Sequence, residues 1–269
     1  MQPFAYVLGA AQDGGHPQPG CTRPCCRDVA APHLPACLAV VDGDQRWLID
    51  ATPALPEQLA RLGAVAPGPI SGILLTHAHM GHYTGLVHLG REGMGLRDLP
   101  LYVQPRMATF LSTNGPWSQL VQLGNVRLEV GHGWTLSPRI RVEAIPVAHR
   151  DEYSETVAFL VRGPARSLLW LPDLDAWDDR LPGLIAGVDA AWIDGTFWAD
   201  GELERPMTEV PHPRIRETIE RLQTLPERDR VRFVHLNHTN PAWRPASAEA
   251  AAIRAAGMAV AHEGERLSL

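Results

Sequence analysis

The chain has 269 residues, a formal net charge of −6 and 45% hydrophobic residues. This length predicts one domain over residues 1–269, built around a large core or two packed halves. All 24 basic side chains are arginines and they are scattered, which argues against nucleic-acid binding. No apolar stretch approaches the roughly 18 residues that span a membrane, and the first residues lack a secretory pattern, so we expect a cytoplasmic protein.

Short apolar segments alternate with loops along the chain. In the first half they predict strands at 4–11, 37–43, 46–52, 72–77 and 99–104 and helices at 53–62 and 105–113. In the second half they predict strands at 126–130, 140–149, 156–163, 167–173, 190–197 and 231–238 and helices at 212–225 and 247–257. Strands mixed with helices in both halves predict a layered α/β protein.

Three histidines lie at and just after the end of the apolar strand predicted at 72–77. His77 and His79 are two residues apart, so both side chains can aim at one point, and His82 could reach a neighbouring point. Imidazole nitrogens suit zinc, iron, copper and nickel. Loop histidines with ordinary hydrogen bonds are the alternative, but three histidines in six residues favour a metal site.

Three further polar residues each end an apolar segment: His149, Asp173 and His238. Any one of them alone is more often an ordinary polar group at a strand end than a ligand. Their shared placement predicts that a sheet presents all three at one edge, where they could complete the histidine site.

These residues together resemble the metallo-β-lactamase superfamily, through an HxHxxH motif at His77, His79 and His82 followed by single ligands in the same order. The resemblance covers nearly the whole chain and implies a four-layer αββα sandwich. It implies that His77, His79 and His149 hold a first metal. It also implies that His82 and His238 hold a second metal and that Asp173 bridges the two. Gly81 replaces an acid that supplies a further second-site ligand in that superfamily, so this site could be weakened or could accept a water.

Three other segments, VLGAAQDGGHPQPGC, IDGTFW and HLNHTNP, resemble the family of pyrroloquinoline quinone biosynthesis B proteins. The layout is also similar to that of the cyclic phosphodiesterases of phosphonate breakdown. These relatives imply a structural zinc held by a cysteine-rich first loop and a downstream histidine. Here the cysteine spacing is altered, because Arg23 replaces the middle cysteine. The predicted zinc ligands are Cys21, Cys25, Cys26 and His212, and reduced loop thiols are the alternative.

Three functions are compatible with these residues. The first is a metal-dependent hydrolase in which Asp173 and His238 are catalytic and metal-bound hydroxide attacks an ester, phosphodiester, lactone or amide-like bond of a small-molecule substrate. The second is a non-haem iron oxygenase of quinone cofactor synthesis, since two histidines and one carboxylate form its ligand set. The third is a binding or carrier protein that keeps only a structural zinc. Zinc is the expected metal, iron is the alternative, and a homodimer is left open.

Overall fold

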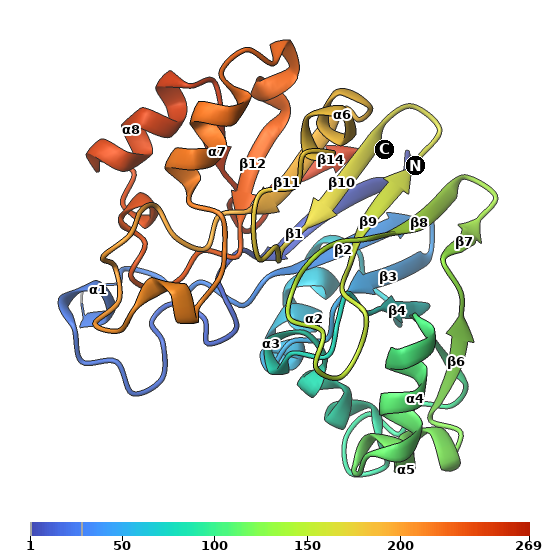
Figure 1. The fold of residues 1–269 in the computed structure, drawn as a ribbon. Helices are drawn as coiled ribbons and strands as arrows, with labels where there is room; N and C mark the ends of the chain where they lie inside the picture. Colours follow the sequence, from blue (N-terminus) through green and yellow to red (C-terminus); the bar gives the residue numbers. More distant parts are fainter. Residues whose placement is uncertain (1, 28) are drawn as a thin grey trace.

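The computed structural model describes residues 2–27 and 29–269. Met1, in the predicted domain, and Asp28, in its first loop, lie outside this description. Within the described residues, two seven-stranded sheets face each other and helices cover their outer faces (Figure 1). No described helix has the length and apolar character needed to cross a membrane.

The first sheet comes from the first half of the chain and one C-terminal strand. Its order is β14 (Arg266–Ser268), β1 (Phe4–Gly9), β2 (Cys37–Asp42), β3 (Gln45–Ile49), β4 (Gly72–Leu74), β5 (Leu99–Val103) and β6 (Val126–Val130). Helices α2 (Leu55–Val65), α4 (Pro105–Thr113) and α5 (Trp117–Gln122) pack on its outer face, and α3 (Met80–Tyr83) and η1 (Thr84–Leu89) follow β4.

The second sheet comes from the second half of the chain. Its order is β13 (Ala259–Val260), β12 (Val231–Val234), β11 (Ala190–Asp194), β10 (Ser167–Leu171), β9 (Val157–Arg162), β8 (Ile140–Pro146) and β7 (Gly133–Ser137). Helices α6 (Leu181–Ala186), α7 (Ile215–Leu222) and α8 (Ala248–Ala255) lie on its outer side. The remaining short helices are α1 (Pro24–Arg27), η2 (Met207–Glu209), η3 (Pro226–Arg230) and η4 (Pro241–Trp243).

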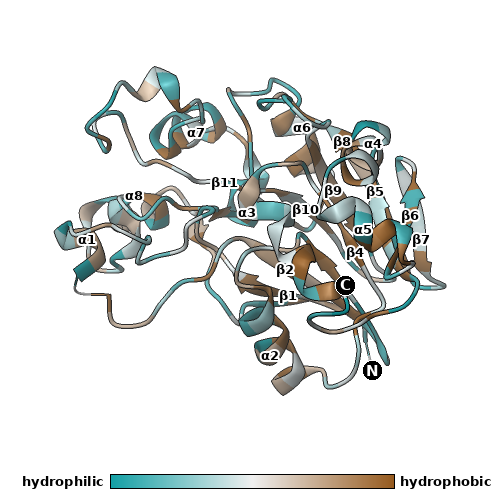
Figure 2. Cartoon of the chain, turned by 90° about the horizontal axis from the view of Figure 1, so that it is seen from below, coloured by the Kyte–Doolittle hydropathy of each residue, from teal (hydrophilic) through white to brown (hydrophobic). Residues whose placement is uncertain are grey.

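Three hydrophobic layers explain the order of the sandwich. Strand β2 shows the principle, because Ala39 and Val41 pack toward the helices while Leu38 and Val40 pack between the sheets. A strand buried on both faces reads as a continuous apolar run, which is why CLAVV has no polar alternation. Figure 2 shows the hydrophobic colours concentrated in the strands and the hydrophilic colours along the loops. This is the four-layer αββα sandwich that the resemblance implied.

Parallel strands bring the candidate ligands to one edge of the sandwich. Strands β10, β11 and β12 run parallel, as do β3, β4 and β5, so the residues after their carboxyl ends are neighbours. The predicted strand at 231–238 is shorter than expected. It ends at Val234, because the next residue, His235, has a φ of 63° and turns the chain. The short strands β7, β13 and β14 and helix α5 were not predicted from the sequence.

Candidate metal centre

We call the candidate metal-binding side chains at this edge of the two sheets the histidine centre. They are Asp13, His77, His79, His82, His149, Asp173, His212 and His235. Three of its histidines, His77, His79 and His149, converge first. The His77 Nε2 and His79 Nδ1 atoms lie 2.9 Å apart, and His149 Nε2 lies 3.1 Å from His79 Nδ1. Two imidazole nitrogens on one tetrahedral zinc are separated by about 3.3 Å, given Zn–N bonds of about 2.0–2.1 Å. The three predicted first-metal ligands therefore stand where one ion could hold them.

A second group lies beside the first. His82 Nε2 is 3.2 Å from Asp173 Oδ2, and His235 Nε2 is 3.5 Å from the same oxygen. Asp13 Oδ1 lies 3.3 Å from His82 Nε2 and 3.4 Å from His235 Nε2. A nitrogen and an oxygen on one tetrahedral zinc are about 3.4 Å apart. Asp13, His82 and His235 offer donor atoms within 4.8 Å of one another and could hold one ion, and Asp173 lies beside both of these histidines.

Asp173 stands between the two groups. Its Oδ1 is 3.5 Å from His149 Nε2, while its Oδ2 faces His82. Burial alone would raise the pKa of Asp173, but the neighbouring His235 and His82 hold it well below its usual value. Among the described residues, the buried His82 Nε2 and Asp173 Oδ2 atoms have no hydrogen-bond partner. Buried donors and acceptors are nearly always satisfied, so two orphaned atoms that face each other fit a bound cation.

The far nitrogen of each histidine is held by a neighbouring oxygen. Asp50 is fully buried, and its carboxylate accepts from the Thr76 backbone N–H at 2.8 Å and contacts His82 Nδ1 at 2.8 Å. The other contacts are Thr76 Oγ1 to His77 Nδ1 at 2.9 Å, Glu152 Oε2 to His79 Nε2 at 3.1 Å, Asp175 Oδ1 to His149 Nδ1 at 2.8 Å and Thr196 Oγ1 to His235 Nδ1 at 3.0 Å. Such partners fix the ring orientation and the tautomer of metal-binding histidines.

His212 belongs to the histidine centre, which corrects its predicted place among the cysteines. Its Nδ1 contacts Asp194 Oδ2 at 2.7 Å, and it offers a nitrogen within 4.8 Å of donor atoms on Asp173 and His235. Burial opposes protonation of His212, but the Asp194 carboxylate outweighs it and raises the pKa of the ring. With Nδ1 engaged by Asp194, the other ring nitrogen is left to face the centre.

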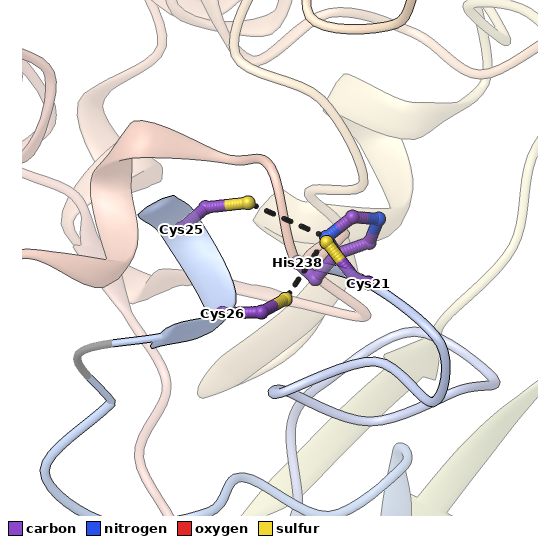
Figure 3. Close-up of side chains that lie close together, drawn as sticks. All are labelled: Cys21, Cys25, Cys26 and His238. Carbon is purple, nitrogen blue, oxygen red and sulfur yellow. Dashed lines mark hydrogen bonds between the residues drawn. The ribbon is translucent and has the colours of Figure 1, made fainter. Parts of the chain in front are cut away.

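The cysteine cluster is a separate set of four donors: Cys21, Cys25, Cys26 and His238 (Figure 3). His238 Nδ1 lies 3.3 Å from Cys26 Sγ and 3.6 Å from Cys25 Sγ. A sulfur and a nitrogen on one tetrahedral zinc are about 3.5 Å apart, given a Zn–S bond of about 2.3 Å. The prediction that His238 is catalytic and binds the second metal is therefore wrong in placement. His238 takes the place predicted for His212 among the cysteines, and His235 takes the place predicted for His238 beside His82.

Two residues of the histidine centre were not predicted as ligands from the sequence. His235 was assigned to the interior of a strand, although it is the first polar residue after the buried VRFV segment. That signal had identified His149 and Asp173 and could have identified His235 as well. Asp13 lies in a glycine-rich loop with no local pattern that distinguishes it as a donor. The fourth cysteine, Cys37, is fully buried in β2, as expected for a small hydrophobic side chain.

Comparison with known families agrees with this fold. The profile of the beta-lactamase superfamily domain matches residues 45–236. The chain belongs to the beta-lactamase superfamily. Among curated superfamily relatives, it is 31% identical to the coenzyme PQQ synthesis protein B of Methylobacterium radiotolerans, over 98% of this chain and 99% of the relative. The protein of the same name from Methylobacterium nodulans is 30% identical over the same shares.

Two solved structures share the fold of this superfamily member. Zn(2+)-bound PqqB from Methylobacterium extorquens superposes with a TM-score of 0.85 at 24% identity, over 99% of this chain and 100% of the other. A diphosphatase of the PhnP family superposes with a TM-score of 0.71 at 22% identity, over 99% and 97% of the two chains. Both structures therefore share the fold that the sequence resemblance implied.

Proposed function

We propose that this beta-lactamase superfamily member is a metal-dependent hydrolase that cleaves an ester or phosphodiester bond in a small anionic substrate. The observation that carries the proposal is the position of Asp173. Its two oxygens face the two groups of histidines, at 3.5 Å from His149 and 3.2 Å from His82. A carboxylate shared between two adjacent ligand sets is the arrangement expected of a two-metal hydrolytic site.

Zinc is the metal that we assign to both positions. His77, His79 and His149 would hold the first ion, His82 and His235 the second, and Asp173 both. The nitrogen and oxygen donors suit zinc, and the PqqB structure that shares this fold is zinc-bound. Bound there, zinc supplies Lewis acidity and lowers the pKa of a coordinated water to about 7.

We assign to His212 the donation of a proton to the leaving group. It lies beside Asp173 and His235, and Asp194 holds its Nδ1 at 2.7 Å. That contact stabilises the protonated ring, because a carboxylate at hydrogen-bond distance favours imidazolium. A buried, oriented imidazolium next to the reacting bond is the arrangement required for general acid catalysis.

A hollow beside the histidine centre could receive the substrate. It has a volume of about 420 Å³, and its walls include Asp13 on the side of the centre and Arg205 and Asn237 elsewhere. Arg205 adds a guanidinium to a hollow that Asp13 would otherwise make negative. An anionic substrate group suits this wall, because guanidinium pairs well with phosphate and carboxylate oxygens.

The test combines metal removal with a ligand substitution. Chelation should abolish hydrolysis of bis(p-nitrophenyl) phosphate, and added zinc should restore it. His79→Ala should lower kcat/KM by roughly 10³-fold or more, because a metal supplies several kcal/mol and about 4 kcal/mol equals that factor. His262→Ala is the control, since His262 is 76% exposed at the surface. Retained turnover in His79→Ala would refute the proposal. A binding or carrier protein would show zinc uptake but no turnover of any ester or phosphodiester.

A second candidate is an iron-dependent oxygenase that acts in coenzyme PQQ synthesis. The names of the curated relatives favour it, and so does the contact of His82 and His235 with Asp173 Oδ2, which supplies two histidines and one carboxylate. Anaerobic loading with ferrous iron, followed by an oxygen electrode and a tyrosine-derived substrate, tests it. Oxygen uptake that requires iron, with no zinc-dependent hydrolysis, would replace the first proposal.

A further inference from the structure

Gly81 occupies the motif position where the superfamily resemblance implies an acid, and the structure shows what fills its space. A Cβ atom built on Gly81 would lie 2.5 Å from Cγ and 2.8 Å from Cα of Asp13, and closer still to Asp13 Oδ1. Real Cβ atoms essentially never approach other atoms within 3.0 Å. The carboxylate of Asp13 therefore stands where the first side-chain atoms of any other residue at position 81 would be.

Backbone conformation does not explain the glycine. Gly81 lies in helix α3, and its φ is outside the positive range that favours glycine, whereas nine other glycines of the described chain have positive φ. An ordinary residue could adopt this helical backbone. The proximity of Asp13 is thus the reason for a residue without a side chain at position 81.

We propose that Asp13 is the carboxylate ligand of the second metal and replaces the acid that position 81 lacks. This inference rests on the proposed two-metal site. Asp13 Oδ1 lies 3.3 Å from His82 Nε2 and 3.4 Å from His235 Nε2, and Asp173 Oδ2 is 3.2 Å and 3.5 Å from the same two nitrogens. All four of these nitrogen–oxygen distances are close to the spacing of about 3.4 Å expected around one tetrahedral zinc.

The loop that carries Asp13 is anchored beside the second group. The Gln12 backbone N–H donates to the Leu236 carbonyl at 2.9 Å, and the Leu236 N–H donates to the Ala10 carbonyl at 3.0 Å. Gln12 and Asn237 also join through their side chains. These bonds tie the residues before Asp13 to those after His235. The donor has moved from the HxHxxH motif to a loop about 70 residues earlier in the sequence, and the fold returns it to the same place.

Zinc titration of the apo-protein tests this assignment. The wild-type chain should bind three zinc ions, one in the cysteine cluster and two in the histidine centre. Asp13→Asn keeps the size of the side chain and should weaken one of the three by about tenfold or more, since the charged ligand is lost. Asp44→Asn is the control, because Asp44 is an exposed carboxylate in the β2–β3 turn.

An exchange of the two positions is the sharper experiment. Gly81→Ala and Gly81→Asp should each weaken the same zinc ion, because the new atoms displace Asp13. The double variant Asp13→Gly/Gly81→Asp should regain the third zinc to within about threefold of the wild-type dissociation constant. Far-UV circular dichroism and the thiolate bands of cobalt bound to the cysteine cluster report whether each variant is folded.

Three results would overturn the assignment: no third zinc in the wild-type chain, wild-type affinity for all three zinc ions in Asp13→Asn, or a double variant no better than Asp13→Gly. Zinc is counted without substrate, so the result is separable from the proposed function. If an active Asp13→Asn enzyme binds the third zinc with unchanged affinity, Asp13 is not a ligand and the hydrolase proposal stands. If the exchange restores zinc binding in a protein that hydrolyses nothing, the hydrolase proposal fails and Asp13 stands as a ligand.

Discussion

The cysteine cluster and the histidine centre are two metal-binding arrangements that the chain builds in opposite ways. Three of the four donors of the cysteine cluster come from six consecutive residues, Cys21 to Cys26, and only His238 is distant. The histidine centre draws three histidines from the segment after β4 and single residues from the loops after β1, β8, β10 and β12 and before α7. One is assembled by a loop and the other by the sheet edge.

The two arrangements also differ in what holds their donors. In the histidine centre, buried oxygens such as Asp50 Oδ2 and Asp194 Oδ2 fix the far side of the rings. In the cysteine cluster, Cys26 Sγ accepts a hydrogen bond from the Gln18 backbone N–H at 3.4 Å, and its other contacts are to fellow donors. The histidine centre should therefore keep its geometry without metal, while the cysteine loop should depend on metal for its order.

Substitution of His212 and of His238 should give the largest difference in activity and metal binding between the two clusters. His212→Ala should lower hydrolysis by roughly 10²–10⁴-fold, the usual contribution of a positioned proton donor, and should leave the thiolate bands of the cobalt protein unchanged. His238→Ala should alter those bands and lower the melting temperature by roughly 5–10 °C, equivalent to a zinc linkage of about 2–3 kcal/mol. Lost hydrolysis in His238→Ala together with altered thiolate bands in His212→Ala would restore the pattern predicted from the sequence.

The pH dependence of zinc affinity should separate the clusters next. Burial raises the pKa of Cys26 to about 11 and also raises that of Cys25, so both thiols carry protons at neutral pH in the apo-protein. Zinc must displace these protons, and its affinity for the cysteine cluster should fall by on the order of 100-fold or more for each unit of decrease in pH.

In the histidine centre, fewer protons stand in the way of zinc. Burial lowers the pKa of His77 and brings that of His149 to about 4, so both rings are already neutral. His82 keeps a proton, because the Asp50 and Asp173 carboxylates outweigh its burial and raise its pKa. We expect about a tenfold change per pH unit there. Chelator competition at pH 6 to 8 on the wild-type chain and on Cys26→Ser, which loses the cysteine site, gives the two pH slopes, and equal slopes would contradict this difference between the clusters.

Removal of an orienting carboxylate should have an intermediate effect on the histidine centre only. Asp50→Asn keeps the size of the side chain, and asparagine tolerates the φ of 70° at this position. It removes the charge that faces His82 Nδ1 and should weaken zinc at the second position by roughly 10–100-fold. The zinc affinity of the cysteine cluster is the internal control. If it falls in parallel, the substitution has loosened the fold and not the ligand.

The sequence was sufficient for residues whose position follows from a local pattern. His77, His79, His149 and Asp173 directly follow apolar strands, and parallel strands place such residues at one edge, so their grouping could be predicted along with the sandwich. His212 and His238 were wrongly placed because contacts between residues far apart in the sequence determine their positions. The HLNH segment continues an apolar strand in sequence, but His235 turns the chain and the Asn237 N–H bonds to the Thr196 carbonyl at 2.9 Å. His235 therefore remains at the edge, and His238 is carried across to the cysteines.

Asp13 shows the same limit in its strongest form. Its partners are His82 and His235, which lie 69 and 222 residues further along the chain, and nothing in the sequence AAQDGG indicates a ligand. The absence of an acid at position 81 was visible in the sequence, whereas its replacement became visible only when the loop and helix α3 were seen in contact.

The smallest effect is expected in the hollow that connects the two clusters, since Asp13 and His238 both line it. If substrates enter there and react only at the histidine centre, Arg205→Gln should raise KM for an anionic substrate by about twofold to fivefold and leave kcat nearly unchanged. That range corresponds to an exposed charge pair worth up to about 1 kcal/mol. Arg216→Gln, on the exposed side of α7, is the matched control. An equal change for a neutral ester would mean that Arg205 shapes the hollow rather than pairing with charge. A loss of kcat would mean that Arg205 takes part in the reaction. The catalytic machinery would then extend from the histidine centre into the wall of the hollow, toward the cysteine cluster.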